Sequence, residues 1–102
     1  MALLHTVNKS PFEKNSLETC LRIAVEGCSV LLIEDGVYGA MDRTSLNGKV
    51  SDASNRLQFY VLGPDLKARG LREKDVMDCI EVVDYDGFVD LVVGHDATNA
   101  CL

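Results

Sequence analysis

Four cysteines and two histidines are the side chains in this sequence best suited to nucleophilic or metal chemistry. They are Cys20, Cys28, Cys79, Cys101, His5 and His95. A thiolate can attack a sulfur atom and can then hold that atom as a persulfide. None of the cysteines forms a C-x-x-C pair, and the histidines lack the local spacing of a zinc site. The thiols are therefore the first candidates for function, and no metal or cofactor is expected.

The motifs of other functional classes are absent from the sequence. No G-x-S-x-G elbow marks a hydrolase nucleophile, and no G-x-G-x-x-G or Walker-type loop is present to cradle phosphates. His5 lies within the apolar segment 3–7, where a packed, hydrogen-bonded histidine is more common than a catalytic base. A hydrolase and a nucleotide-binding domain are both disfavoured.

Three of the cysteines occupy positions that favour an inert thiol. Cys28 and Cys79 each adjoin a predicted strand, so both are expected to be enclosed in the core. Cys101 lies one residue from the end of the sequence, where we expect it to be exposed, with no neighbour that would lower its pKa.

Cys20 is the candidate site residue. It falls in a predicted helix over residues 15–27, with Asn15 as the N-cap and Glu18 completing a capping box. On a helical wheel Cys20 lies at the edge of the apolar face, where a thiol can be half-covered yet reachable. Border packing and a reactive role are both compatible with this position. The apolar face itself contains Leu17, Leu21, Ala24 and Cys28.

The rest of the sequence alternates apolar segments of strand length with helical segments. Strands are expected over residues 3–7, 29–33, 57–62 and 78–84, and helical segments over 37–41, 65–70 and 85–94. Residues 42–55 predict a loop with some helix, and residues 95–102 a polar tail with an apolar tip. The alternation predicts parallel βαβ units in one α/β domain, residues 1–102. Any ligand would collect where the strands end.

Composition limits the partners that this chain can have. The formal net charge is −6, and the basic residues between 65 and 75 are interleaved with acidic ones, which disfavours direct binding to nucleic acid. No apolar run reaches the ~18 residues that a membrane helix needs. Residues 1–7 also lack the basic and apolar regions of a signal peptide. We therefore expect a cytoplasmic domain with free thiols and no direct contact with a membrane.

Four segments of the chain resemble the DsrH/TusB family. They are residues 4–12 (LHTVNKSPF), 31–37 (LLIEDGV), 65–71 (DLKARGL) and 84–89 (DYDGFV). The likeness runs nearly end to end, and the opening segment together with EDGVY is its most specific part. The resemblance implies a small flavodoxin-like α/β fold of the DsrE superfamily, with three layers around a mainly parallel sheet of four or five strands.

The resemblance also implies a function. Members of this family pair with DsrE-like and DsrF-like sister subunits in a heterohexamer, which relays sulfane sulfur as cysteine persulfide between donor and acceptor proteins. One branch serves the oxidation of stored sulfur, and the TusB branch serves 2-thiolation of the tRNA wobble uridine. In the DsrE-like sister subunits the main reactive cysteine follows the third strand, where this chain has Gly63-Pro64.

Cys20 favours the sulfur-oxidation branch, because the resemblance implies a cysteine at this helix position in DsrH-type members. The expected function is thus a DsrH-like subunit of a sulfurtransferase-type complex, in which Cys20 takes part in persulfide transfer. The alternative is a TusB-like structural subunit of the tRNA relay with no chemistry of its own. A small-ligand or nucleotide-binding domain is a third hypothesis, which the missing phosphate loop disfavours.

Overall fold

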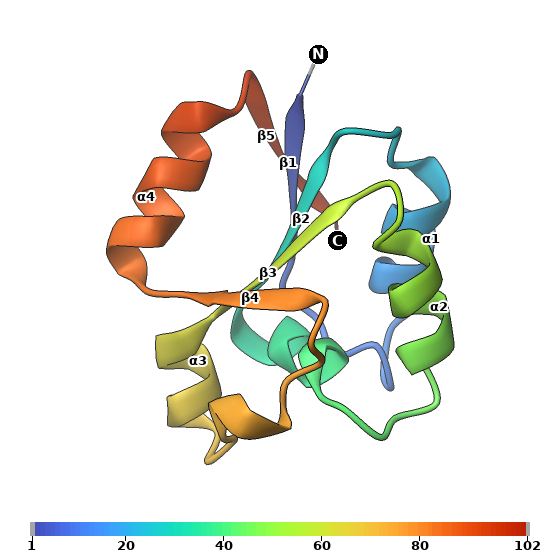
Figure 1. Ribbon diagram of the computed structural model, residues 1–102, viewed down its shortest axis with the longest axis vertical. Helices are drawn as coiled ribbons and strands as arrows, with labels where there is room; N and C mark the ends of the chain where they lie inside the picture. Colours follow the sequence, from blue (N-terminus) through green and yellow to red (C-terminus); the bar gives the residue numbers. More distant parts are fainter. Residues whose placement is uncertain (1, 102) are drawn as a thin grey trace.

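The computed structural model describes residues 2–101 and builds them around a five-stranded β-sheet (Figure 1). The strand order is β4-β3-β2-β1-β5, and every neighbouring pair is parallel. The chain therefore adds strands on one side of β1 and then returns to place the last strand on its other side. The strands are β1 (Leu3–Val7), β2 (Ser29–Leu32), β3 (Gln58–Leu62), β4 (Ile80–Val83) and β5 (Ala97–Cys101).

Helical segments connect the strands and form the outer layers. In Figure 1, α1 and α2 lie on one side of the sheet and α4 lies on the other, so the predicted three-layer α/β fold is confirmed. None of the helices in the described part of the chain is long and apolar enough to cross a membrane. The segments are α1 (Ser16–Ile23), η1 (Glu34–Ala40), α2 (Asn47–Ala53), α3 (Gly63–Ala68), η2 (Glu73–Asp75) and α4 (Tyr85–Gly94).

The core forms where α1 and α2 pack against the central strands. All four residues of β2 are buried, as a continuous apolar run in a parallel sheet predicts. Leu17 and Leu21 of α1 are buried as well, which confirms the predicted apolar face of that helix. The carboxyl ends of β1 to β4 meet at one edge of this core, because the strands run in the same direction.

The predicted polar tail at residues 95–102 is wrong for the part that the structure describes, because residues 97–101 form strand β5. Four of its five residues are exposed and only Cys101 is buried, so the segment lacks the apolar pattern of an interior strand. It pairs with the edge of β1, whose N–H and C=O groups would otherwise have no partner. Leu102, the expected apolar tip, lies outside the described residues.

Two helix boundaries also differ from prediction. Helix α1 ends at Ile23 rather than near Gly27, and the side chain of Asn15 makes no capping hydrogen bond. The Gly63-Pro64 pair ends β3 as expected but also opens α3, since proline is well tolerated in the first helical turn. Helix α4 matches its prediction, and the Asp84 carboxylate caps it by accepting the backbone N–H of Gly87 at 2.8 Å.

A glycine fixes the close contact between η1 and the end of β1. A β-carbon added to Gly36 would overlap the carbonyl oxygen of Val7 and would lie 2.8 Å from its carbonyl carbon. The same carbonyl accepts the backbone N–H of Ile33 at 3.0 Å, so it cannot move without breaking the connection between β1 and β2. No residue other than glycine fits here without a backbone shift.

We predict that Gly36→Ala lowers the free energy of unfolding by about 3 kcal/mol, because the added methyl group overpacks backbone against backbone. Gly48→Ala is the matched control. A β-carbon there meets nothing within 4 Å, and alanine in the first turn of α2 should stabilise the chain by about 0.4 to 1 kcal/mol. Urea denaturation of both variants measures the difference, and equal stabilities would refute the close contact.

Candidate functional site

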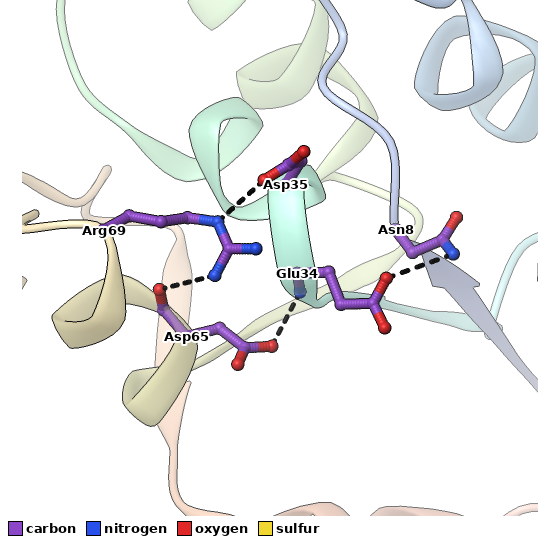
Figure 2. Close-up of polar contacts among 5 residues, drawn as sticks. All are labelled: Asn8, Glu34, Asp35, Asp65 and Arg69. Atoms are coloured by element: carbon purple, nitrogen blue, oxygen red, sulfur yellow. Dashed lines mark hydrogen bonds and ion pairs between the residues drawn. The ribbon is translucent and has the colours of Figure 1, made fainter.

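Polar residues from three strand ends meet at the carboxyl edge of the sheet (Figure 2). Asn8 follows β1, Glu34 begins the segment after β2, and Asp65 lies in the first turn of α3 after β3. The Asp65 carboxylate accepts the backbone N–H of Glu34 at 2.6 Å, and the Asn8 side-chain amide donates to the Glu34 carboxylate at 3.4 Å. Glu34 has φ 49°, and the bond from Asp65 supports this left-handed conformation.

Arg69 completes this group. Its Nε donates to Asp35 Oδ1 at 2.8 Å, and a terminal nitrogen donates to the backbone carbonyl of Asp65 at 3.2 Å. The hydrogen bond to Asp35 raises the pKa of Arg69. The Asp35 carboxylate binds the guanidinium, the Asp65 carboxylate accepts a backbone N–H, and the Glu34 carboxylate binds the Asn8 amide. These contacts form a polar clamp between the segments that follow β1, β2 and β3.

A hollow of about 570 Å³ lies beside this clamp, at the ends of β3 and β4. Gly63 and Pro64 line one part of it, and Lys67, Glu73 and Asp84 contribute charge. No cysteine or histidine lines it among the residues that the structure describes. The hollow thus offers no nucleophile at the strand end where the family resemblance implies one in the sister subunits.

The thiols lie elsewhere, and their burial differs from what the sequence predicts. Cys20 is 0% exposed, so its predicted place at a reachable edge of the apolar face is wrong for the isolated chain. Cys101 is only 9% exposed rather than free in solution. Cys28 is enclosed as predicted, whereas Cys79 is half-buried. Strands β1 and β5 both contact α1, and His5 and Cys101 from these strands lie beside Cys20.

Cys20 shares its surroundings with two other reactive side chains. The His5 ring and the sulfur atoms of Cys20 and Cys101 all lie within 4.8 Å of one another. Nδ1 of His5 is 3.9 Å from the Cys101 sulfur and 3.2 Å from the side-chain nitrogen of Asn99. The prediction that His5 is packed and hydrogen-bonded is therefore confirmed.

Burial sets the protonation of this group. Burial raises the pKa of the Cys20 thiol well above its usual range, and a hydrogen bond and charge repulsion from Cys101 raise it further. Burial also lowers the pKa of His5. Both shifts favour a neutral thiol beside a neutral imidazole over a thiolate–imidazolium pair. Cys20 is a poor nucleophile as long as β5 covers it.

Sequence reasoning identified Cys20 and His5 separately but missed their neighbours Asn99 and Cys101. Both neighbours lie on β5, whose register places Asn99 opposite His5 and Cys101 opposite Val7. No local pattern links residues this far apart. Recognition that β1 needed a second neighbouring strand would have been the available signal.

Together, the fold and these two groups of residues define a parallel α/β domain in which a polar clamp joins three loops and the Cys20 and Cys101 thiols are buried. A family model described as "DsrH like protein" matches residues 9–98, and the chain belongs to this family. Curated relatives agree. Protein TusB of Pectobacterium parmentieri is 34% identical over 91% of this chain and 94% of its own length. Protein TusB of Shigella flexneri is 36% identical over 96% of this chain and 99% of its own length.

Solved structures share the fold at low sequence identity. The ychN protein from E. coli superposes with a TM-score of 0.83 at 13% identity, covering 98% of each chain. MTH1491 from Methanobacterium thermoautotrophicum superposes with a TM-score of 0.75 at 17% identity, covering 94% of this chain and 96% of its own. These similarities support the α/β fold.

We predict that alkylation of the native chain modifies Cys79 at least about tenfold faster than Cys20, because Cys20 is buried and protonated. Timed reaction with iodoacetamide and peptide mass spectrometry give both rates. The urea-unfolded chain is the control, in which the two rates should converge. Equally fast labelling of Cys20 in the native chain would contradict its burial.

Proposed function

We propose that this chain is a TusB-like subunit of a cytoplasmic sulfur-relay complex that serves 2-thiolation of the tRNA wobble uridine. The observation that carries the proposal is the near full-length match to relatives named TusB, at 34% and 36% identity. In this role the chain holds sister subunits in place and has no chemistry of its own.

The covered thiols support a role without chemistry. A sulfur carrier needs a thiolate that a donor persulfide can reach, and Cys20 meets neither condition in the isolated chain. The hollow beside Gly63 and Pro64 corresponds to the expected position of the reactive cysteine in the sister subunits, and within residues 2–101 no thiol lines it. The sulfur atom would therefore travel on the sister chains.

Helix α4 supports a role in assembly. None of its residues is buried, and four large apolar side chains point into solvent. Single apolar residues are normal on a protein surface, but a contiguous apolar patch along one helix is typical of an interaction site. DsrE-like and DsrF-like sister subunits in a heterohexamer are the proposed partners. The exposed side chains are Tyr85, Val89, Val92 and Val93.

The net charge supports an indirect route to tRNA. At −6 the chain lacks the surplus of lysine and arginine that neutralises phosphates, so another protein of the relay would contact the RNA.

A DsrH-like subunit of a sulfur-oxidation complex is the second candidate function, favoured by the presence of Cys20 on α1. In that case the Cys20 thiolate attacks the outer sulfur of a donor persulfide, forming Cys20 persulfide and releasing the donor thiolate. A partner would first have to displace β5, because this strand covers Cys20.

We predict that co-expression with DsrE-like and DsrF-like chains gives a heterohexamer, and that the double substitution Val89→Asp, Val93→Asp disrupts it. The substituted positions are 59% and 79% exposed, so the isolated chain should fold normally. Val25→Asp, at a position 61% exposed outside α4, is the matched control and should leave assembly intact. Size-exclusion chromatography with light scattering reads the outcome, and an intact complex with the double variant would argue against α4 as the interface.

We predict that Cys20→Ser leaves sulfur throughput of the assembled complex unchanged, because the TusB-like role places no sulfur on this chain. The complex is exposed to a persulfidated donor and each chain is weighed by mass spectrometry. A gain of one sulfur atom on the Cys20 peptide, together with slower transfer by the variant, would instead establish the DsrH-like role.

A further inference from the structure

Three side chains that bind soft metal ions converge at the point where the strand order reverses. His5 lies on β1, Cys20 on α1, and Cys101 at the carboxyl end of β5. His5 is the middle residue of β1, so the group lies between the sheet and α1. All three potential donor atoms lie within 4.8 Å of one another. We propose that His5, Cys20 and Cys101 form a zinc-binding site.

The distances suit tetrahedral coordination. Zinc binds sulfur at about 2.3 Å and imidazole nitrogen at about 2.0 Å, which places the two donors about 3.6 Å apart at a tetrahedral angle. The Cys101 sulfur and Nδ1 of His5 are 3.9 Å apart, so a shift of a few tenths of an ångström brings these two atoms to the tetrahedral separation. The largest distance between two of the donor atoms is at most 4.8 Å, and zinc binding would shorten it by about 1 Å.

Asn99 supplies the fourth ligand. Its side-chain nitrogen lies 3.2 Å from Nδ1 of His5, where it faces the ring lone pair that a metal would use. Rotation of the amide brings Oδ1 to the same place, and amide orientation depends on the hydrogen-bond partners present. Zinc then replaces the amide hydrogen as the partner of the His5 nitrogen, and the carboxamide oxygen faces the metal.

Charge selects zinc over other cations. Two thiolates and Zn²⁺ sum to zero, which matters because Cys20 is fully buried and Cys101 nearly so. A singly charged copper ion would leave one negative charge unbalanced in the core. Calcium and magnesium prefer oxygen ligands, which are too few here. The site therefore takes a divalent ion that accepts sulfur and nitrogen ligands.

This site is independent of the proposed assembly but bears on Cys20. A zinc-bound Cys20 is not available to accept sulfur. The metal would therefore be consistent with a structural subunit that carries no sulfur itself. The local-spacing rule missed the site, because His5 precedes Cys20 by 15 residues and Cys101 follows it by 81. Only the pairing of β5 with β1 brings the three together.

Cobalt titration of the full chain tests the proposal. Co²⁺ reports on tetrahedral thiolate sites through a near-ultraviolet thiolate-to-metal band, and Zn²⁺ should displace it at one ion per chain. Cys101→Ser should weaken binding by more than about a hundredfold, since even loss of an outer-shell partner costs 10- to 100-fold. Cys79→Ser is the matched control and should bind normally. No charge-transfer band, or an unchanged band in Cys101→Ser, overturns the proposal.

A second measurement uses the unaltered chain and decides the matter if Cys101→Ser does not fold. Zinc should protect Cys101 from alkylation while leaving the rate at Cys79 unchanged. It should also raise the melting temperature, because a ligand that binds only the folded state stabilises it. Unchanged alkylation of Cys101 in saturating zinc overturns the proposal. Neither readout depends on sister subunits, so failure of the zinc site and failure of the proposed assembly are distinguishable.

Discussion

The pairing of β5 with β1 is the contact on which the sheet edge and the surroundings of Cys20 depend. Without it β1 would be an edge strand, and α1 would carry Cys20 at an open border. With it, a strand of mostly exposed residues closes the sheet, and its one buried side chain, Cys101, lies against Cys20. Burial, together with the hydrogen bond from Cys101, raises the pKa of the Cys20 thiol. This backbone pairing therefore brings Cys101 against Cys20.

The loops after β1, β2 and β3 serve a different purpose. Asn8, Glu34, Asp65 and Arg69 connect the loops after β1, β2 and β3, and Gly36 lets η1 lie directly on the end of β1. In many parallel α/β domains this edge binds a ligand, whereas here its polar groups bind each other. Loops joined by polar contacts and an exposed apolar α4 are compatible with a subunit whose function depends on its neighbours.

Elements with a clear local pattern could be predicted from the sequence. The bounds of β1 and α4 matched their predictions, because an apolar run and a capped amphipathic segment carry their own signals. Strand β5 could not be predicted, since four of its five residues are exposed and only the free edge of β1 gives the segment a place in the sheet. The error at Cys20 follows from the same cause. A helical wheel orders residues around one helix and gives no information on a strand that begins 77 residues after Cys20.

Hydrogen exchange of the β5 backbone amides, followed by NMR on the isolated chain, tests this account most directly. If β5 is a cooperative part of the sheet, its amides that face β1 should exchange at least about a hundredfold more slowly than in an unstructured peptide. Exchange at peptide rates in β5, while β1 and β2 stay protected, would contradict the account. Cys20 would then lack the cover that makes it inert.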